Sequence, residues 1–357
     1  MSEIALGNEA ELAMPAGPIA GPAAWYGKDM EKSTEWIYAL SETDLGELEG
    51  ALRAVRAAGL GIADIARGDF PLPRLSATLD ELRAEVLRGR GFVLIRGLPL
   101  DRYSLEDAAI LYWGVGSYFG AARPQNAKGH LLGHVIDLGR DPYDTSARIY
   151  QTIARQTYHV DTCDIVSLLC LRKAKSGGLS SLVSAVAIYN EILARRPDLL
   201  PVLFRPFEAD RRDEIPPGRK PWYTAPVFAW HGGLLTAQLV RRYIESARRF
   251  PELAPLTGEQ TEALDLFEAL ADELAMFMDF QPGDMQFVHN HQILHDRTAF
   301  EDWPDRKRHL LRLWLCPPDG RPLPPSFADK YNGRIEIGDR GGMYIEGARL
   351  HAPLEPV

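Results

Sequence analysis

A histidine and an aspartate stand two residues apart in the segment Tyr158-His-Val-Asp-Thr162. In an extended segment, side chains two residues apart point to the same face. His159 and Asp161 can therefore offer an imidazole nitrogen and a carboxylate oxygen to one metal ion. The tripeptide alone is a weak signal, because a His-x-Asp sequence arises readily by chance and needs supporting context.

A third ligand must come from elsewhere in the chain, and His295 is the best candidate. Two histidines and one carboxylate on one face of an octahedron leave three positions open, the arrangement that non-haem Fe(II) oxygenases use. Zinc would instead prefer a tetrahedral site with one open position. His289 and His291 are rivals to His295, because we expect an extended run over Met285–Leu294 that puts all three on one face.

Two arginines follow His295 in a segment, Arg308–Cys316, that we expect to be a strand. Arg308, Arg312 and Trp314 would share one face of that strand. An arginine among leucine and tryptophan side chains is costly to bury unless it meets an anion. A dicarboxylic co-substrate supplies such an anion, and a planar guanidinium can bind a carboxylate through two hydrogen bonds. The arginines therefore predict an organic acid beside the metal.

Taken together, these residues resemble the taurine dioxygenase (TauD/TfdA) superfamily. The likeness extends over roughly Gly91 to Pro317, and it is carried by His159-x-Asp161, Gly177-Gly-Leu-Ser180, His295, Arg308 and Arg312. The resemblance implies an α+β protein with a double-stranded β-helix (jelly-roll) core, flanking helices and iron inside the mouth of the core. It also implies a 2-oxoglutarate-dependent dioxygenase that uses Fe(II), 2-oxoglutarate and O2.

The resemblance also implies a role for each matching residue. The iron ligands would be His159, Asp161 and His295. Arg312 would bind the distal carboxylate of 2-oxoglutarate with help from Ser180, and Arg308 falls at the family's other arginine near the co-substrate. The chain has Leu179-Ser180 where that family typically has Asp-Thr, which keeps a hydroxyl but puts taurine as the substrate in doubt. The carboxylate of Asp161 argues against halogenation, because related halogenases carry a small residue there.

The implied reaction is hydroxylation of an unactivated C–H bond in a small organic molecule, coupled to decarboxylation of 2-oxoglutarate to succinate and CO2. Three alternatives stay open: desaturation or ring closure at the same site, a catalytically silent jelly-roll that binds a ligand or metal, and a zinc hydrolase. The two arginines argue against the last two, since neither needs an anchor for a co-substrate. The aromatic segment Pro221–Trp230 favours a substrate with an apolar body.

Composition excludes several other classes of protein. The chain of 357 residues has a formal net charge of −9 and no run of lysine and arginine, so we expect no nucleic-acid partner. No stretch approaches the length of a transmembrane helix, and residues 1–27 lack the features of a signal peptide. Three cysteines suit a reducing cytoplasm. We expect a cytoplasmic protein with a small-molecule substrate and no membrane partner. Relatives are often dimers or tetramers, and the sequence leaves the oligomeric state open.

Helices and short strands alternate along the chain. We expect the first long helix after Ser41, capped with Asp44 and ended by Gly59. Further helices are expected at about 76–88, 105–114, 184–196 and 257–273, with strands at 91–97, 158–171, 223–230 and 308–316. The segment Ala121–His134 is predicted to be a polar loop, whose Gln125 and Asn126 are interpreted as solvated.

The predicted organisation is one domain behind a leader. Residues 1–27 are rich in alanine, glycine and proline and predict a flexible leader. Residues 28–357 form a single dioxygenase domain in this interpretation. Its parts are a helical N-terminal portion (28–90), a jelly-roll core with helical insertions (91–317) and a C-terminal extension (318–357).

Overall fold

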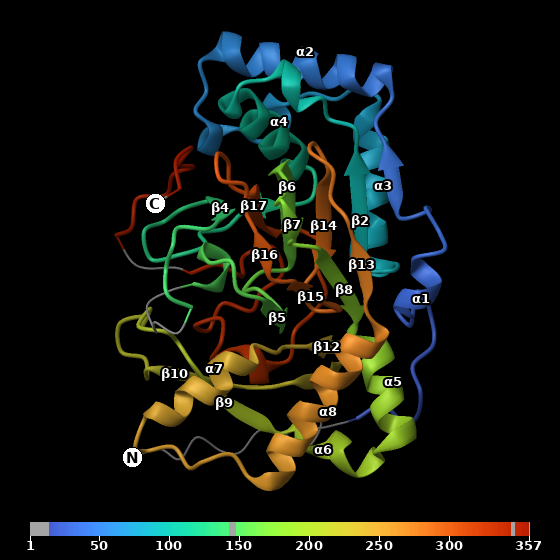
Figure 1. The fold of residues 1–357 in the computed structure, drawn as a ribbon, viewed down its shortest axis with the longest axis vertical. Helices are drawn as coiled ribbons and strands as arrows, with labels where there is room; N and C mark the ends of the chain where they lie inside the picture. The colour runs from blue at the N-terminus through green and yellow to red at the C-terminus, as the bar shows by residue number, and fades with distance from the viewer. Residues whose placement is uncertain (1–13, 143–147, 344–346, 357) are drawn as a thin grey trace.

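Two β-sheets that face each other form the centre of the protein in the computed structural model, which describes residues 14–142, 148–343 and 347–356 (Figure 1). The larger sheet has seven strands in the order β1-β2-β14-β6-β17-β3, with β4 also paired to β17. These strands are β1 (Ile37–Ala39), β2 (Phe92–Arg96), β14 (Met285–His289), β6 (Ile165–Arg172), β17 (His309–Cys316), β3 (Ala121–Ala122) and β4 (Leu132–Ile136).

The smaller sheet has four strands in the order β13-β8-β15-β5. They are β13 (Met276–Met278), β8 (Ser180–Ser184), β15 (Ile293–Arg297) and β5 (Gln156–His159). Apolar side chains from both sheets, such as Val166, Leu182 and Ile293, meet in one buried cluster between them. This arrangement confirms the predicted α+β class with a jelly-roll core.

The central strands of the larger sheet, β2, β14, β6 and β17, are buried on both faces, which explains their nearly continuous apolar sequences. In β17, Leu311 and Leu313 pack against the N-terminal helices, whereas Leu310 and Trp314 face the smaller sheet. Arg312 has the same parity as Leu310 and Trp314, so its side chain also enters the space between the sheets. The strand therefore delivers a charged group to an otherwise apolar interior.

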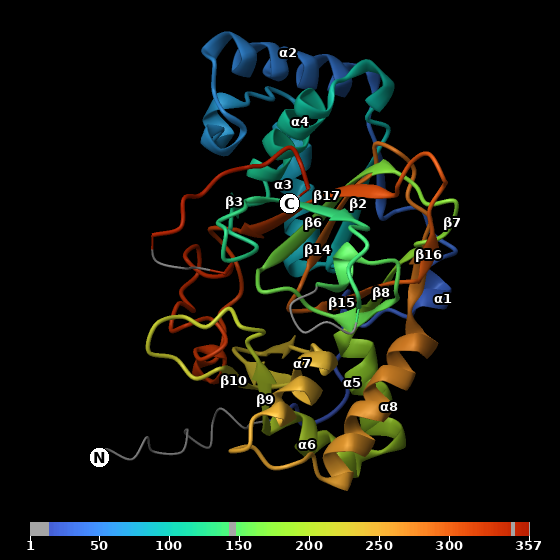
Figure 2. The ribbon, with the colours of Figure 1, turned by 60° about the vertical axis from the view of Figure 1, so that its left-hand side comes forward.

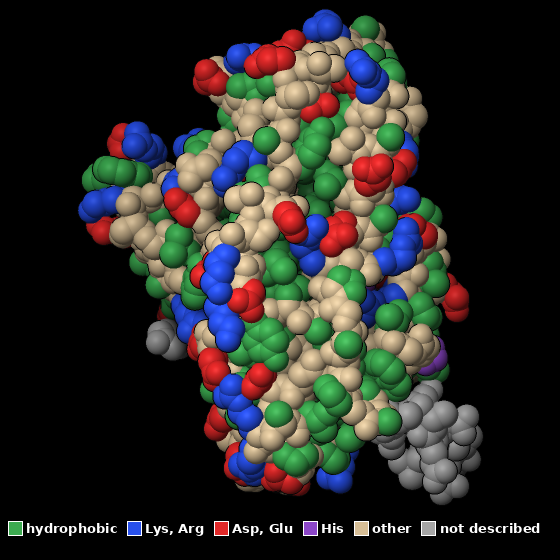
Figure 3. Space-filling view, turned by 90° about the vertical axis from the view of Figure 1, so that its right-hand side faces the viewer, with side chains coloured by type: hydrophobic (Ala, Val, Ile, Leu, Met, Phe, Trp, Pro, Cys, Tyr) green, Lys and Arg blue, Asp and Glu red, His purple; other side chains and the backbone are tan. Residues whose placement is uncertain are grey.

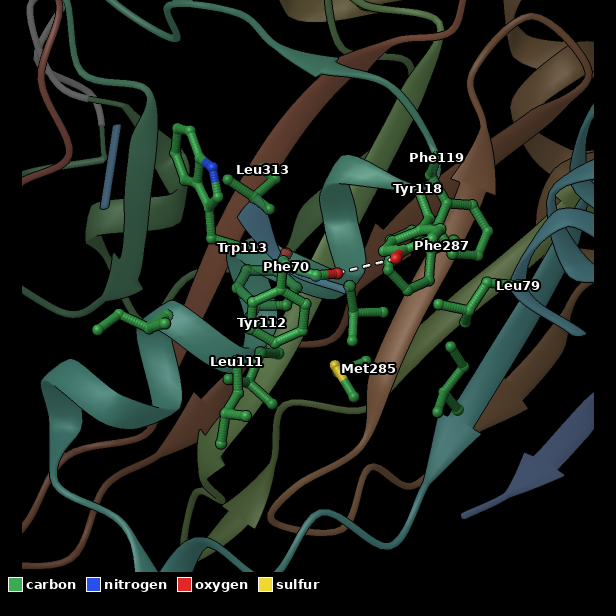
Figure 4. Packing of buried hydrophobic residues seen from close by; sticks show 14 of the residues in the cluster. Phe70, Leu79, Leu111, Tyr112, Trp113, Tyr118, Phe119, Met285, Phe287 and Leu313 are labelled. Atoms are coloured by element: carbon green, nitrogen blue, oxygen red, sulfur yellow. Dashed lines mark hydrogen bonds between the residues drawn. The ribbon is translucent and has the colours of Figure 1, made fainter. Parts of the chain in front are cut away.

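Three helices from the first third of the chain cover the outer face of the larger sheet: α2 (Glu42–Ala58), α3 (Leu75–Arg88) and α4 (Leu105–Ser117). The predicted cap of α2 is confirmed, since Ser41 and Asp44 form a capping box and Gly59 ends the helix with φ of 66°. Between the helices and the sheet, the rings of Phe119 and Phe287 stack at a centroid distance of 3.8 Å (Figure 4). This packing holds the outer faces of β14 and β17 against the helices.

A second helical layer packs on the smaller sheet, at the lower end of the molecule (Figure 2). Its helices are α5 (Ala185–Arg195), α6 (Leu200–Phe204), α7 (Arg241–Ser246) and α8 (Gly258–Leu274). Two hairpins complete it, formed by β9 (Pro206–Asp210) with β10 (Trp222–Pro226) and by β11 (Phe228–His231) with β12 (Leu234–Ala237). The pair β7 (Ser176–Gly177) and β16 (Phe300–Glu301) lies beside the core.

Part of the predicted leader belongs to this layer. Residues 1–13 lie outside the described residues. Met14 and Ile19 pack on the helical cluster, and the backbone N–H of Ile19 donates to Oδ1 of Asn190 at 2.8 Å. Trp25 is buried just before α1 (Gly27–Met30). The expectation of a flexible leader is therefore wrong for residues 14–27, because apolar side chains and hydrogen bonds hold them to the domain.

Two predicted segments are divided differently in the structure. The run Met285–Leu294 is not one strand: β14 ends at His289 in the larger sheet, and β15 begins at Ile293 in the smaller one. Residues 290–292 carry the chain from one sheet to the other. The predicted loop Ala121–His134 contains β3 and the start of β4, both paired to β17. In each case pairing to a distant strand decides the local conformation.

The surface is mixed in charge on the face that carries α1 and α3. Acidic and basic side chains alternate over that face, and neither sign forms a large patch (Figure 3). Within the part of the chain that the structure describes, no helix has the length and apolar character needed to cross a membrane.

Candidate active site

Two neighbouring strands bring the predicted metal ligands together. In the antiparallel pair of β5 and β15, His159 stands directly opposite His295, and their ring centroids are 4.2 Å apart. Asp161 follows β5, and its Oδ1 lies 3.9 Å from Nε2 of His159. Each of the three residues offers a ligand atom, and these atoms all lie within 4.8 Å of one another. The chain thus gathers two imidazoles and one carboxylate at a single point between the sheets.

The two histidines suit a metal ion chemically. Nδ1 of His159 donates to the backbone carbonyl of Thr157 at 2.8 Å, which leaves Nε2 as the atom able to ligate. Nε2 is 2.8 Å from the Gln156 amide nitrogen, and Nδ1 of His295 is buried with no hydrogen-bond partner among the described residues. Burial lowers the pKa of both rings, that of His295 to about 3, so both are neutral at neutral pH. Neutral imidazole is the form that binds a metal.

Asp161 is held in place from three sides. Nε1 of Trp314 donates to its Oδ2 at 2.7 Å, and Nη1 of Arg312 lies 3.4 Å from the same oxygen. Its own backbone N–H donates to Oδ1 of Asn290 at 3.2 Å. Burial disfavours its charge, but Arg312 and the neighbouring rings outweigh burial, and the pKa of Asp161 is lowered. The residue is therefore an ionised, oriented carboxylate.

The rival histidines are engaged elsewhere. Nε2 of His291 lies 3.1 Å from Oδ1 of Asp164, and Nδ1 of His289 lies 3.4 Å from Nη2 of Arg321. Neither joins the group around Asp161. The expectation that His289, His291 and His295 share a face is wrong, because the chain changes sheets between the first and the last of them. Strand parity alone could not distinguish the three histidines as ligands, but the change of sheet puts His295 in a different place from His289 and His291.

Gln125 lines the cavity beside the candidate ligands, although the sequence led us to interpret it as solvated. It is buried rather than solvated, and its Oε1 accepts a hydrogen bond of 2.7 Å from Nε of Arg312. Its Nε2 donates to the backbone carbonyl of Arg312 at 2.8 Å. A Cβ at Gly133 would come within 2.3 Å of Oε1, so a side chain at that position would displace the Gln125 amide. The Tyr150 ring lies on another side of Arg312, 4.5 Å from the guanidinium carbon. In the sequence, the only signal for Gln125 was that an amide side chain occurs in a predicted polar loop.

Arg308 and Ser180 lie apart from Arg312. Ser180 stands opposite Arg297 in the pair of β8 and β15, on the same face of the sheet as His295. The guanidinium carbons of Arg297 and Arg308 lie 4.7 Å and 5.4 Å from the centre of the Phe300 ring. Both arginines are buried, and their guanidinium groups donate hydrogen bonds to backbone carbonyls. Burial lowers the pKa of Arg308 to about 10 and that of Arg297 to about 9.

A cavity of about 610 Å³ opens beside the candidate ligands His159 and Asp161, which both line it. Its wall is strongly charged and includes Arg148, Arg155, Asp210, Arg211, Glu214, Arg241, Glu245, Asp265, Glu268, Arg312 and Lys330. Of the aromatic segment Pro221–Trp230, only Tyr223 lines the cavity, while Phe228 packs in the core. The segment that suggested a substrate with an apolar body therefore lies mostly away from the cavity, whose wall combines charged side chains with apolar ones such as Val160, Val240 and Met343.

The C-terminal extension closes one side of this cavity. Lys330, Asn332, Gly342 and Met343 line it. The extension is fixed by Arg340, which is fully buried and whose Nε lies 2.9 Å from Oδ1 of Asp164. Asp164 is three residues from Asp161 in sequence, so the extension is tied directly to the segment that carries the candidate ligands.

Comparison with known proteins relates the chain to a family of enzymes. Residues 55–314 match the model of a family described as taurine catabolism dioxygenase TauD, TfdA family. The FR-33289 synthase of Streptomyces rubellomurinus is 32% identical over 323 residues, which cover 87% of this chain and 94% of that protein. A taurine hydroxylase-like protein of Stachybotrys chartarum is also 32% identical, over 85% of this chain and 83% of its own.

A solved structure shows the same fold. The asparagine oxygenase in complex with Fe(II), 2S,3S-3-hydroxyasparagine and succinate superimposes with a TM-score of 0.61 at 19% sequence identity. The match covers 79% of this chain and 93% of that chain. At this identity the likeness concerns the architecture of the two sheets and their helices.

Proposed function

The chain belongs to the taurine catabolism dioxygenase TauD, TfdA family, and we propose that it hydroxylates an unactivated C–H bond of a small polar molecule with iron held by His159, Asp161 and His295. As a member of this family it is a 2-oxoglutarate-dependent dioxygenase that uses Fe(II), 2-oxoglutarate and O2. The observation that carries the assignment of ligands is the convergence of three ligand atoms within 4.8 Å of one another, two of them on residues that line the cavity.

The residues around the ligands support this role. When bound, Fe(II) with 2-oxoglutarate supplies the oxidising chemistry, and the protein supplies position and electrostatics. The Thr157 carbonyl fixes the ring of His159, while Trp314 and Arg312 fix the carboxylate of Asp161. Such outer partners orient metal ligands and strengthen binding. The Gln156 amide faces Nε2 of His159, so it must turn aside when that nitrogen ligates.

We assign the distal carboxylate of 2-oxoglutarate to Arg308 and Ser180, which replaces the expectation that Arg312 binds it. Arg312 touches the candidate ligand Asp161, so it lies at the metal end of a chelating co-substrate. Arg308 and Arg297 place two buried positive charges near Ser180, and no carboxylate among the described residues lies within ion-pair distance of either guanidinium. Buried charges of one sign call for a counter-ion. The far carboxylate of the co-substrate would meet that need.

A spectroscopic experiment tests the proposal without knowledge of the substrate. Anaerobic addition of Fe(II) and 2-oxoglutarate should give a visible charge-transfer band, and exposure to O2 should then release succinate. His159→Ala should lose both signals. Protein loaded with Zn²⁺ should be inactive, whereas a zinc hydrolase would need that ion. Absence of the band in folded wild-type protein, or an unchanged band in the variant, would overturn the assignment of the ligands.

A further inference from the structure

We propose that Lys330, in the C-terminal extension, binds an anionic group of the primary substrate and so selects an acid, such as a carboxylate, phosphonate or sulfonate, for oxidation. This inference rests on the proposed function, because it names the substrate class of the same cavity. It goes beyond the residues shared with the family, since the matching stretch ends at residue 314.

Lys330 is a buried ammonium group at the cavity wall. Its side chain lines the cavity, and the residue is 6% exposed. Nζ donates one hydrogen bond, of 3.0 Å, to the neutral amide oxygen Oε1 of Gln238, and it lies 5.3 Å from the centre of the Tyr331 ring. An ammonium group carries three donors, so most of its hydrogen-bonding capacity remains for a ligand.

The other basic groups of the cavity wall are already neutralised or engaged. Carboxylates pair with Arg148, Arg155, Arg211, Arg241 and Arg312. Arg242 donates to the backbone carbonyl of Pro142. Within the described residues, no carboxylate lies at ion-pair distance from Nζ of Lys330. Leaving a buried charge without a counter-ion is costly unless a ligand supplies one.

The position of Lys330 is set by a dedicated clamp. The buried guanidinium of Arg211 donates to the backbone carbonyl of Asp329 at 2.9 Å and to its Oδ1 at 2.8 Å. It also donates to Oδ1 of Asn332 at 3.0 Å. On the other side of the lysine, Phe327 and Tyr331 are buried against Ala229. Residues before and after Lys330 are thus anchored to the lower helical layer, and the ammonium group is held at the wall.

Lys330 is also electrostatically linked to the metal site. Burial lowers its pKa to about 8, while Cys163 and Asp161 oppose that change. Lys330 and Asp161 both line the cavity, and they form no ion pair with each other. An anion that bridges from Lys330 toward the centre of the cavity would bring its neighbouring carbon atoms beside the candidate iron ligands. Anchoring a substrate at a remote charged group in this way positions the reacting bond.

The test compares small acids with a neutral analogue of similar size. The protein is saturated with Fe(II) and 2-oxoglutarate without oxygen, and binding of propylphosphonate, propanesulfonate, butyrate and butyramide is followed through the change in the charge-transfer band. We expect at least one acid to bind wild-type protein more tightly than butyramide. Lys330→Met should weaken that acid about 10-fold or more, the usual value of one charge-assisted hydrogen bond. Lys330→Arg should retain most of the preference.

Two controls make the result decisive. Lys220→Met removes an equal charge from an exposed residue outside the cavity wall and should leave the preference unchanged. Thermal unfolding shows whether Lys330→Met is folded, and Lys330→Gln serves if it is not. Equal binding of acids and butyramide to wild-type protein, or equal loss of both in Lys330→Met, would overturn this inference alone. Loss of the band already in wild-type protein would instead overturn the proposed function.

Discussion

The indole N–H of Trp314 donates to the carboxylate of Asp161 across 2.7 Å, from one β-sheet to the other. Trp314 belongs to β17 of the larger sheet, while Asp161 follows β5 of the smaller one. The hydrogen bond therefore fixes a candidate iron ligand relative to the opposite wall of the core. Because the tryptophan is also part of the apolar cluster between the sheets, packing and ligand orientation depend on the same side chain.

Replacing Trp314 should weaken metal binding more than it weakens the fold. Trp314→Phe keeps an aromatic ring but removes the donor to Asp161, and loss of such an outer partner typically lowers metal affinity about 10–100-fold. Competition with a chelator measures the Fe(II) affinity. Trp113→Phe is the matched control, since Nε1 of Trp113 donates to the carbonyl of Ile65 far from the site. Equal effects of the two substitutions on affinity would contradict this role of Trp314.

Substitutions of His295 and His291 should have different effects, the first on metal binding and the second on thermal stability. His295→Ala should abolish the charge-transfer band with Fe(II) and 2-oxoglutarate, because it removes a candidate ligand. His291→Asn should keep the band but lower the thermal stability, because His291 contacts the buried Asp164. Metal content after dialysis and differential scanning calorimetry measure the two effects. A band lost in His291→Asn and retained in His295→Ala would reverse the assignment.

Arg308 and Ser180 should govern affinity for 2-oxoglutarate. Ser180→Ala should raise its KM about 2–10-fold, the effect of one ordinary hydrogen bond, and Arg308→Met should raise it by about 100-fold through loss of a charged pair. Bound Fe(II) should be unaffected in both proteins. Arg172→Met removes an exposed guanidinium that donates to the carbonyl of Lys307 and serves as the control. If Arg312→Met raised the KM for 2-oxoglutarate and Arg308→Met did not, the assignment of the distal carboxylate to Arg308 would be wrong.

Stability should fall in mild acid partly because of His309. Burial, with His134 and Arg172 nearby, lowers the pKa of His309 to about 3, below the value of about 6.5 in an unfolded chain. Between these values only the unfolded state takes up the proton, so the stabilisation present above about pH 6.5 is lost as the pH falls toward 3. The contribution of this residue is about 1.4 kcal/mol per pH unit. Urea unfolding between about pH 4 and pH 6 measures this effect. The free energy of unfolding of His309→Gln should change less steeply with pH than that of wild-type protein, by about 1.4 kcal/mol per pH unit.

Much of the fold could be predicted because local signals and tertiary structure agree there. The capping pair Ser41 and Asp44, the closing Gly59 and the apolar stripe between them specify α2, and the structure contains each feature. The segment around Asn290 has no comparable local signal. Whether a strand continues or crosses to another sheet depends on which strands pair with it, here β6 for one half and β8 for the other. Such pairing connects residues more than a hundred positions apart.

For the site, the convergence of His159, Asp161 and His295 could be predicted, whereas the surroundings of these residues could not. The spacing of His159 and Asp161 and the parity of Arg312 in β17 are local properties, and both correspond to the observed geometry. Gln125 and Lys330 lie in irregular segments whose sequence gives no periodicity. Their burial results from contacts with Arg312 and Gln238, which only the folded chain brings near. Polar residues in loops were therefore interpreted as solvated, which was wrong for Gln125.

The ion pair between Arg340 and Asp164 joins two residues that are synthesised far apart in time. Every side chain proposed to hold iron or 2-oxoglutarate has been synthesised once the ribosome has passed Trp314. At that point the Asp164 carboxylate, only 1% exposed in the finished protein, still lacks the guanidinium that pairs with it. A chain that ends between the two positions would carry every candidate ligand, but the carboxylate of its Asp164 would keep, among the described residues, only the contact with His291. We therefore expect such a truncated chain to hold the segment from Asp161 to Asp164 less firmly than the full chain does.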